Sequence, residues 1–393
     1  MKNAKKIVVG VTGGIAAYKA LDLVSALIKM QYDVTVIMTE EATKIVAPLA
    51  FEALTHKKCI LSLFDEFQGD YIPHITIQDA DLFIVVPATA NIIAKMAIGL
   101  ADDALSTALI ATKAKVLVCP AMNSTMFLNK KVQENIKEII RLGYNVLTPI
   151  SGMLACGVEG IGKLPSIDNI LLEISKMLYS KKDFNNKNVL ITIGGTQEDI
   201  DSVRVIGNKS SGKMGLALAI EAYKRGANVT IVKGNVKVDI PEYLGRIIEV
   251  KTTNDMRTAV LDNLEGQDFI IKAAAPADYC VKNKQTEKIK NENVTLELVK
   301  NPDIAKEVGE RKNKKQKLII FSAETSDLIE NAKKKLASKN ADMVVANDVT
   351  LPGAGFNCDT NIVQIFTAKN SLNVDIKTKQ EIAEIILDEA IKI

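Results

Sequence analysis

Only two histidines and five cysteines occur in the sequence, so each one in an unusual setting is a candidate for chemistry. His74 stands between apolar residues in a predicted loop, where partial burial could tune its imidazole to act as an acid or base. Cys156 lies in the glycine-rich segment Gly152–Lys163, which favours an exposed thiol on a mobile flap. A lone histidine is more often structural, and a lone cysteine is more often an inert buried thiol, as we expect for Cys59 and Cys119.

Two glycine pairs, Gly13-Gly14 and Gly194-Gly195, directly follow apolar runs. Neither pair belongs to a G-x-G-x-x-G motif, which disfavours an NAD-dependent dehydrogenase. The first N–H groups of a helix that begins there can still receive an anionic ligand. A plain tight turn explains a single junction equally well, because glycine accepts most backbone conformations.

The segment Gly207–Met214 differs from the G-x-x-x-x-G-K-[ST] phosphate loop at one position. Met214 stands where that motif has the hydroxyl that holds Mg²⁺, so a P-loop NTPase is disfavoured. The serines, glycines and Lys213 at the predicted helix start still suit a phosphate group.

Small residues follow three apolar runs, in the segments Pro87–Asn91, Pro120–Asn123 and Ala273–Tyr279, and the first two segments also carry an amide. Open α/β sheets bind ligands at the carboxyl ends of their strands. The two segments in the first half therefore indicate one shared site. In the third segment Asp278 could meet a cation or a ribose hydroxyl, although in isolation such a residue is commonly a helix cap or a turn residue.

Further segments of the second half suit a polyphosphate. Asn301–Ile304 has Pro302 at a predicted helix start, where the early N–H groups are available to an anion. Lys335 and Lys339 lie four residues apart, on one face of a predicted helix. A solvated lysine face is the commoner explanation for such a pair, and likewise for the charge run around Lys288.

These segments alternate with apolar, β-branched runs and helix-length stretches, which predicts mainly parallel sheets flanked by helices. The predicted strands are 7–11, 34–38, 82–86, 116–119, 188–193, 229–232, 269–273, 317–321 and 343–346. The polar stretch 179–188 lacks periodicity and is typical of a linker, and the pattern restarts after it. We therefore predict an α/β protein of two domains, 1–183 and 188–393.

The composition excludes several classes of protein. Of the 393 residues, 47% are hydrophobic and 25% are charged, which is typical of a folded globular protein. A net charge of +3 excludes a broad polybasic nucleic-acid binder. Scattered cysteines without a C-x-x-C pair argue against disulfides and structural zinc. No apolar run approaches the roughly 20 residues of a membrane span, so we expect a cytoplasmic protein without a membrane partner.

The first half of the chain resembles the flavin-dependent cysteine decarboxylases. The whole chain resembles the bifunctional coenzyme A biosynthesis enzymes, in which phosphopantothenoylcysteine decarboxylase precedes phosphopantothenate–cysteine ligase. The matching motifs stand in family order: Gly13–Ala16, the His74 loop, Pro87–Asn91, Pro120–Asn123 and the Cys156 flap. The flap ends in Lys163, where the family commonly has arginine. The resemblance implies a flavodoxin- or Rossmann-like flavoprotein domain followed by a Rossmann-like ligase domain.

For the first domain the resemblance implies FMN, which oxidises the substrate thiol so that CO₂ can leave. His74 would be the active-site base, Asn123 would hold the substrate carboxylate, and Cys156 would donate the proton in the final reduction. The positions that match residues near the flavin and its phosphate are Gly14, Ile15, Thr39, Thr89 and Asn91.

For the second domain the resemblance implies that CTP activates 4′-phosphopantothenate as an acyl-cytidylate, which the amine of L-cysteine then attacks. Lys288 would stabilise charge, Asn208 would serve turnover of the acyl-cytidylate, and the loop 282–290 would close as a lid. Mg²⁺ would arrive with the triphosphate, with Asp278 as a candidate ligand. The implied CTP contacts are Ala273, Ala274, Ala275, Asp278, Lys288, Asn301, Pro302, Asp303, Ile304, Phe321, Lys335 and Lys339.

Two alternatives stay open at this stage. One half could be a folded remnant, although both sets of motifs are complete. A flavin-binding regulatory protein is the non-enzymatic alternative, but it would need neither both His74 and Cys156 nor a ligase domain. The resemblance also implies homo-oligomers, with a trimer-based decarboxylase core and dimeric ligase domains.

Overall fold

The computed structural model divides the chain into two compact units, Met1–Leu178 and Tyr179–Ile393. The predicted residues His74 and Cys156 both lie outside the residues that the structure describes. The described residues are 4–62, 78–154, 157–291, 293–324, 327–348, 355 and 358–393.

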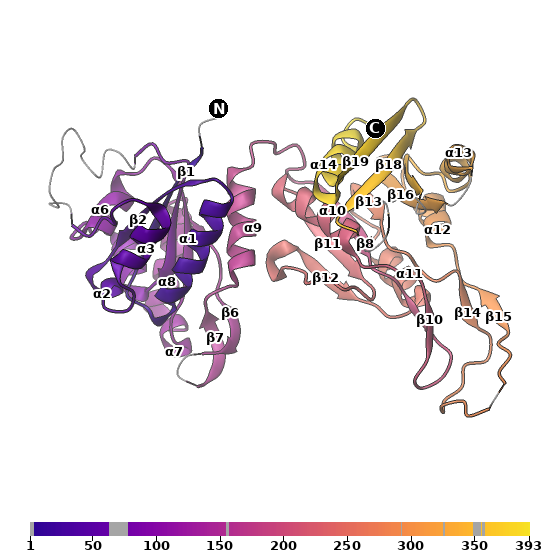
Figure 1. Cartoon of the computed structure of the whole chain (residues 1–393), viewed down its shortest axis with the longest axis horizontal. Coiled ribbons are helices and arrows are strands. Elements are labelled where there is room, and N and C mark those ends of the chain that lie inside the picture. The colour runs from indigo at the N-terminus through magenta and orange to yellow at the C-terminus, as the bar shows by residue number, and fades with distance from the viewer. Residues whose placement is uncertain are drawn as a thin grey trace. The chain divides into compact units, whose positions relative to one another are not determined.

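The first unit contains five parallel strands in the order β2-β1-β3-β4-β5 (Figure 1). Every residue of β3 is buried, because a parallel sheet is covered on both faces. The near-continuous apolar runs of the sequence reflect this burial, and they place the four longer strands correctly to within a few residues. The strands are β1 Lys6–Val11, β2 Asp33–Met38, β3 Leu82–Ala88, β4 Lys115–Pro120 and β5 Asn145–Val146.

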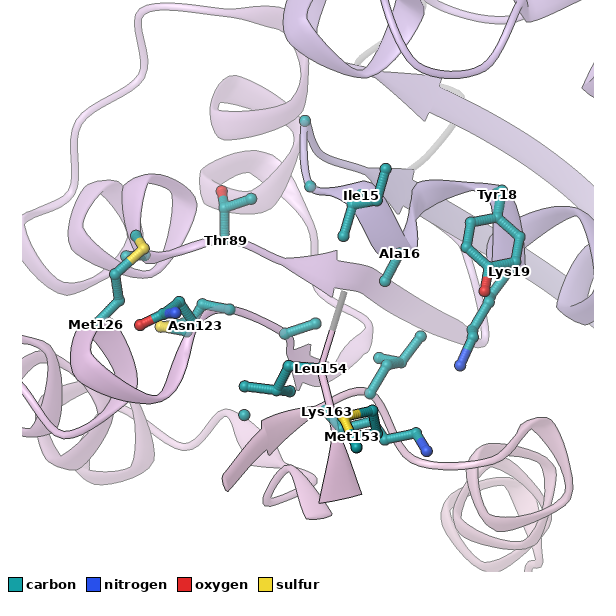
Figure 2. Close-up of a pocket in the computed structure, with 17 residues that line it drawn as sticks. Ile15, Ala16, Tyr18, Lys19, Thr89, Asn123, Met126, Met153, Leu154 and Lys163 are labelled. Atoms are coloured by element: carbon teal, nitrogen blue, oxygen red, sulfur yellow. The ribbon is translucent and has the colours of Figure 1, made fainter. Parts of the chain in front are cut away.

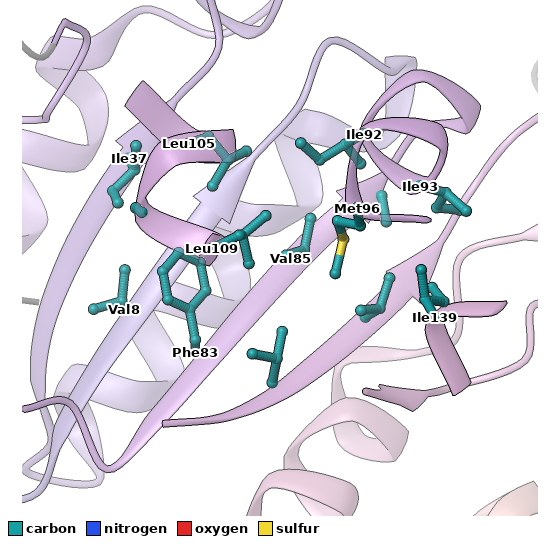
Figure 3. Close-up of a cluster of buried hydrophobic side chains, with 14 of the residues drawn as sticks. Val8, Ile37, Phe83, Val85, Ile92, Ile93, Met96, Leu105, Leu109 and Ile139 are labelled. Atoms are coloured by element: carbon teal, nitrogen blue, oxygen red, sulfur yellow. The ribbon is translucent and has the colours of Figure 1, made fainter. Parts of the chain in front are cut away.

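Helices cover this sheet. Helices α5, α6 and α8 pack on one face through a buried cluster that includes Phe83, Val85, Leu105 and Ile139 (Figure 3). Helices α1 and α9 lie outside this cluster and contact each other, and α9 packs against β3 and β4. The helices are η1 Ile15–Tyr18, α1 Lys19–Lys29, α2 Glu40–Thr43, α3 Pro48–Thr55, α5 Ala90–Ile98, α6 Ala104–Ala111, α7 Ser124–Phe127, α8 Lys130–Arg141 and α9 Ile167–Leu178.

An antiparallel hairpin follows the sheet of the first unit. It pairs β6 Ile150–Met153 with β7 Glu159–Lys163. This hairpin is the segment that the sequence marks as a flap. Its glycines therefore belong to paired strands as well as to the turn between them.

The second unit contains eight strands in the order β12-β11-β8-β13-β16-β17-β18-β19 (Figure 1). The first six are parallel, and their chain order reverses between β8 and β13, as in Rossmann-like sheets. Such a reversal leaves a crevice that commonly binds ligands. The strands are β8 Asn188–Ile193, β11 Asn228–Lys233, β12 Arg246–Glu249, β13 Phe269–Lys272, β16 Lys317–Glu324, β17 Met343–Asp348, β18 Thr360–Thr367 and β19 Ser371–Thr378.

The predicted α/β fold with mainly parallel, helix-flanked sheets is confirmed, and the second unit adds elements that the sequence patterns do not predict. Strand β18 pairs antiparallel with β17, and β19 pairs antiparallel with β18. Two small hairpins pair β9 Gln197–Asp199 with β10 Val205–Gly207, and β14 Tyr279–Val281 with β15 Leu298–Lys300. The helices are α10 Lys213–Lys224, η2 Glu242–Leu244, α11 Thr253–Asp262, α12 Ile304–Arg311, α13 Leu328–Ser338 and α14 Lys379–Ala390.

A buried ion-pair cluster fastens the C-terminal helix α14 to this unit. The Arg225 guanidinium is fully buried and donates to Asp183 (2.8 Å) and to Asp388 of α14 (2.7 Å). It also lies over the ring of Phe184, 4.8 Å from the centroid. Burial opposes the ionisation of Asp183, but the hydrogen bond and charge of Arg225 hold the pKa of that carboxyl below its usual value.

We predict that Arg225→Ala lowers the free energy of unfolding of the second unit by about 3 kcal/mol, because it leaves two carboxylates without their buried partner. Urea unfolding followed by circular dichroism measures the change. Lys392→Ala, which removes a surface pair with Glu389, is the matched control and should leave stability nearly unchanged. Equal effects of the two substitutions would contradict the structural role of the cluster.

Candidate active sites

A cavity of about 630 Å³ opens at the carboxyl ends of β1, β3 and β4 (Figure 2). Its lining comes from the loop after β1, the start of α5, the loop after β4 and the β6–β7 hairpin. The volume lies in the usual range for small-molecule sites, and most of the lining side chains are apolar. Both properties suit the flat ring system of a flavin.

Four of the predicted residues line this cavity: Gly14, Ile15, Thr89 and Asn123. A Cβ on Gly14 would lie 3.4 Å from Thr89 Cγ2, an ordinary van der Waals distance, so Gly14 lines the cavity without a close packing contact. Gly13 has a different role, because a Cβ there would lie 2.3 Å from Glu41 Cβ. The glycine pair therefore combines close packing against α2 with access to the cavity.

Helix caps hold the two polar side chains of this group. Thr89 Oγ1 accepts the N–H of Ile92 at the start of α5 (3.5 Å). Asn123 Oδ1 accepts the N–H of Thr125 at the start of α7 (2.8 Å). The same positions that begin the helices therefore present a hydroxyl and an amide to the cavity.

Thr39 and Asn91, the other two predicted flavin contacts, are not among the lining residues. Thr39 caps α2, where its hydroxyl accepts the N–H of Ala42 (3.3 Å), and its own N–H donates to Val11 at the end of β1 (3.0 Å). Asn91 is an exposed residue in the first turn of α5. Both lie at the edge of the sheet where the cavity opens.

Glycines allow the β6–β7 hairpin to contact the loop after β4. The N–H of Met122 donates to the carbonyl of Gly162 (3.0 Å), and a Cβ on Gly162 would lie 2.2 Å from Met122 O. A Cβ on Gly160 would lie 2.3 Å from the hydroxyl of Ser124. These two glycines thus have a packing reason that is independent of flap mobility.

Lys19, at the start of α1, lines the same cavity although no sequence motif marks it. In Figure 2 the ammonium groups of Lys19 and Lys163 lie on the side of the cavity away from Asn123. Two ammonium groups there suit an anionic group of the ligand, separate from the carboxylate that Asn123 is expected to hold. The signal for Lys19 is its position shortly after the glycine pair, on the first turn of the helix.

The second unit has a cavity of about 460 Å³ beside the start of α10, lined by residues that follow β13 and by residues of β16 and β17. Five predicted residues line it: Asn208, Ala273, Ala275, Asp278 and Phe321. Asn208 is held by a hydrogen bond from its Nδ2 to the carbonyl of Pro276 (2.8 Å). The loop between β10 and α10 and the segment after β13 therefore meet at one site.

The start of α10 forms one wall of this cavity. Gly212 caps the helix with a φ of +81°, and Lys213 is its first residue. A Cβ on Gly212 would lie 2.6 Å from a side-chain carbon of Val236. The first N–H groups of the helix, together with Ser210 and Lys213, suit a phosphate group.

The remaining predicted CTP contacts are not among the residues that line this cavity. Ala274 donates its N–H to Thr192 Oγ1 (3.2 Å), and Lys335 Nζ donates to Ser322 Oγ (2.8 Å). Ala273 lines the cavity, whereas Ala274 packs against the apolar cluster that includes Ile270, Ile304 and Ala332. The predicted contacts therefore form two groups.

Asn301 connects the two groups. Its N–H donates to the carbonyl of Asp278 (2.8 Å), and its Nδ2 donates to the carbonyl of Ala277 (2.9 Å). Pro302 follows it, and Asp303 then caps α12, where its carboxylate accepts the N–H of Lys306 (3.1 Å).

Lys288 is exposed in the loop between β14 and β15 and does not line the cavity. The residue after Lys288 fixes the loop, because the N–H of Ile289 donates to the buried carboxylate of Asp201 (3.2 Å). Burial opposes the ionisation of Asp201, but backbone N–H groups, including that of Ile289, hold its pKa below the usual value. The predicted lid thus has a fixed attachment point beside Lys288.

Lys379, the first residue of α14, lines the second cavity although no sequence pattern singles it out. Burial and the nearby charge of Lys213 lower its pKa. Lys213 itself pairs with Asp359 (2.6 Å). Only the antiparallel edge of the sheet, which the sequence patterns do not predict, brings this end of the chain to the site.

Within the described residues, no group of three or more His, Cys, Asp or Glu side chains could hold a metal ion. Asp278, the candidate magnesium ligand, lines the second cavity. No helix in the described parts of the chain is long and apolar enough to cross a membrane.

Comparison with known proteins assigns the chain to a family. A family model described as "Flavoprotein" matches residues 1–179, and one described as "DNA/pantothenate metabolism flavoprotein C-terminal domain" matches residues 184–393. The chain is 44% identical over 397 residues to the coenzyme A biosynthesis bifunctional protein CoaBC of Bacillus subtilis, a match that covers 98% of each chain. The chain belongs to the family of bifunctional coenzyme A biosynthesis proteins.

Other members of this family match with similar coverage. The CoaBC proteins of Haemophilus influenzae and Escherichia coli are 39% and 38% identical, over 99% and 98% of this chain and over 98% and 97% of theirs. The solved C-terminal domain of a CoaBC protein is 37% identical, covers 54% of this chain and 97% of its own, and has a TM-score of 0.47. The flavoprotein model spans the residues of the first cavity, and the C-terminal model spans those of the second.

We predict that Gly162→Ala displaces the β6–β7 hairpin of this bifunctional protein, because the added carbon would collide with the carbonyl of Met122. The Met122 amide should then exchange its hydrogen at least about tenfold faster, since it loses its acceptor. Gly157→Ala is the matched control: Gly157 also has a positive φ, but among the described residues other than its chain neighbours no atom lies within 4 Å of an added Cβ. Unchanged exchange at Met122 in Gly162→Ala would contradict the packing role of this glycine.

Proposed function

We propose that the chain joins 4′-phosphopantothenate to L-cysteine with CTP and then decarboxylates the phosphopantothenoylcysteine to 4′-phosphopantetheine. The similarity to bifunctional relatives over 98% of the chain carries this proposal. The presence of a separate cavity within each family-model match supports it. Residues 1–183 would form the decarboxylase domain and residues 188–393 the ligase domain.

The first cavity is proposed to hold FMN, which supplies the two-electron oxidation of the substrate thiol that makes loss of CO₂ feasible. Gly14 and Ile15 would lie against the cofactor, and the start of α5 at Thr89 would present N–H groups to it, with Thr39 and Asn91 near by. Asn123 would donate from its amide to the substrate carboxylate, since its oxygen already accepts the N–H of Thr125.

Two residues outside the described ranges would move protons in this reaction. His74 is proposed as the active-site base, and Cys156 on the flap as the acid that delivers a proton in the final reduction. Lys19 and Lys163 would bind the phosphate of the substrate, because both ammonium groups line the cavity on the side away from Asn123. An elongated substrate with an anionic group at each end would span these two sides.

The second cavity is proposed to bind CTP and 4′-phosphopantothenate at the sheet edge. Ala273, Ala275, Asp278 and Phe321 would contact the nucleotide from within the cavity. The start of α10 would receive the phosphate of 4′-phosphopantothenate. The remaining nucleotide contacts, from outside the lining of the cavity, would be Ala274, Asn301, Pro302, Asp303, Ile304, Lys335 and Lys339.

The ligase reaction has two steps that need protection from water. Lys288 would stabilise charge as the acyl-cytidylate forms with release of pyrophosphate, and Asn208 would assist attack by the cysteine amine. The loop that carries Lys288 would close over the cavity and exclude water from the hydrolysable intermediate. Mg²⁺ would enter with the triphosphate, with Asp278 as its candidate protein ligand.

The decisive experiment is incubation of the purified protein with 4′-phosphopantothenate, L-cysteine, CTP and Mg²⁺, followed by mass spectrometry. We expect phosphopantothenoylcysteine first and 4′-phosphopantetheine second. The protein should also be yellow, with a flavin spectrum. A colourless protein that FMN cannot reconstitute would refute the decarboxylase function, and absence of the amide product would refute the ligase function.

For the flap we predict that Cys156→Ser still releases CO₂ but accumulates the oxidised, decarboxylated intermediate, because a hydroxyl is a weaker acid than a thiol. Product masses that differ by two hydrogens from 4′-phosphopantetheine would identify this species. Cys59→Ser, which changes a buried thiol outside the cavity, should complete the reaction. Full turnover by Cys156→Ser would remove the proposed role of this thiol.

The assembly and the cellular location remain predictions. We propose homo-oligomers, with a trimer-based decarboxylase core and dimeric ligase domains, because the family resemblance implies both. Sedimentation of the full-length chain would test the assembly directly.

A further inference from the structure

Lys272, at the end of β13, carries a buried amine that the proposed reactions do not use. The residue is 94% buried, and its Nζ has no hydrogen-bond partner among the described residues. Lys272 is in register with Ile320 of β16, which belongs to the apolar cluster beneath α11, α12 and α13. Strand alternation therefore directs Lys272 to that face of the sheet, opposite to Ala273.

Two charged groups act on this amine from the helices that cover it. Asp303, which caps α12, pairs with Lys339 at the end of α13 (Nζ to Oδ2, 3.3 Å). Burial lowers the pKa of Lys272 to about 7, Asp303 acts to raise it, and Lys339 acts to lower it. The strand neighbours in register with Lys272, Thr192 and Ile320, carry no charge. The carboxylate of Asp303 thus acts electrostatically on both Lys272 and Lys339, but it forms an ion pair with Lys339 alone among these two.

We propose that Lys272 becomes the partner of Asp303 when Lys339 turns to a phosphate of the bound nucleotide. This inference rests on the proposed ligase function, in which Lys339 contacts CTP. A triphosphate carries more charge than a carboxylate and competes for Lys339. Asp303 would then stand beside the triphosphate without a counter-ion. Lys272 accepts one proton from solvent, forms an ammonium and neutralises this carboxylate.

In this scheme Lys272 is a positioning residue, because it acts through Asp303 and not on the nucleotide. Asp303 holds the start of α12, since its carboxylate accepts the N–H of Lys306. The neighbouring segment Asn301–Ile304 is the one expected to contact the nucleotide. A carboxylate that stays neutralised keeps this helix start in place without repelling the phosphates.

The scheme fixes the sign of a pH dependence. Binding raises the pKa of Lys272, because the amine gains an unshared carboxylate. Well below pH 7 the free protein already holds this proton, so binding takes up none. Above pH 7 each bound nucleotide must bring one proton with it, and affinity falls by up to about tenfold for each further pH unit.

Titration calorimetry of the full-length protein with CTP and Mg²⁺ tests the inference. The titrations are run near pH 8, about two units above the last pKa of a phosphate group, so the phosphates are already ionised and release no protons. Comparing two buffers of different ionisation enthalpy gives the number of protons taken up. The wild type should take up close to one proton. Lys272→Met should take up none and bind about tenfold more weakly. Lys272→Arg should bind without uptake, and its affinity should no longer fall with pH, because a guanidinium stays charged.

The control is Lys306→Met on the same helix. Its exposed side chain pairs with the surface residue Glu310 at 3.9 Å, so the substitution should leave affinity and proton uptake unchanged. Wild-type binding without proton uptake overturns the inference and leaves the ligase function intact. If Lys272→Met does not fold, Lys272→Arg decides, since proton uptake retained in that variant overturns the inference. Failure of the wild type to bind CTP refutes the ligase proposal and this inference together.

Discussion

Both units depend on the parallel pairing of buried strands. Parallel neighbours cannot be joined by a tight turn, so the chain returns through a helix that covers one face of the sheet. The carboxyl ends of all these strands then meet at one edge. Segments as distant in sequence as Gly14 and Asn123 line one cavity for this reason, and Asn208 meets Asp278 in the other.

Glycine at specific positions lets the loops at these edges come close together. Because these glycines have no side chain, α2 packs closely on Gly13, the loop after β4 packs closely on Gly162, and the segment at Val236 packs closely on Gly212. In each case a single added carbon would lie within 2.6 Å of another atom. The sequence suggests flexibility or anion binding for these glycines, but they are also packing contacts. The close packing brings backbone N–H groups beside the cavities.

The sequence predicts the fold well wherever burial leaves a simple pattern. Apolar runs locate the parallel strands, because both of their faces are covered. The sequence does not predict strand β19, since only Val374 of its eight residues is buried and no apolar run marks the strand. The sequence also does not identify Lys379 as a residue of the second cavity, because strand β19 leads the chain into α14, which begins at that cavity. Motif order also does not show that Ala273 lines the cavity while Ala274 packs against the apolar cluster, since this depends on how the chain leaves β13.

Two buried cations in the second unit show how the choice of side chain sets its possible role. Arg225 is fully buried between Asp183 and Asp388, and its guanidinium cannot lose a proton at any physiological pH. Such a group can only hold the fold together. Lys272 is almost as buried but lacks a bonded carboxylate, and an amine can pay for burial by giving up its proton. Burial without a partner therefore makes Lys272 responsive to any change in the charge of Asp303, which lies where the nucleotide is expected to bind.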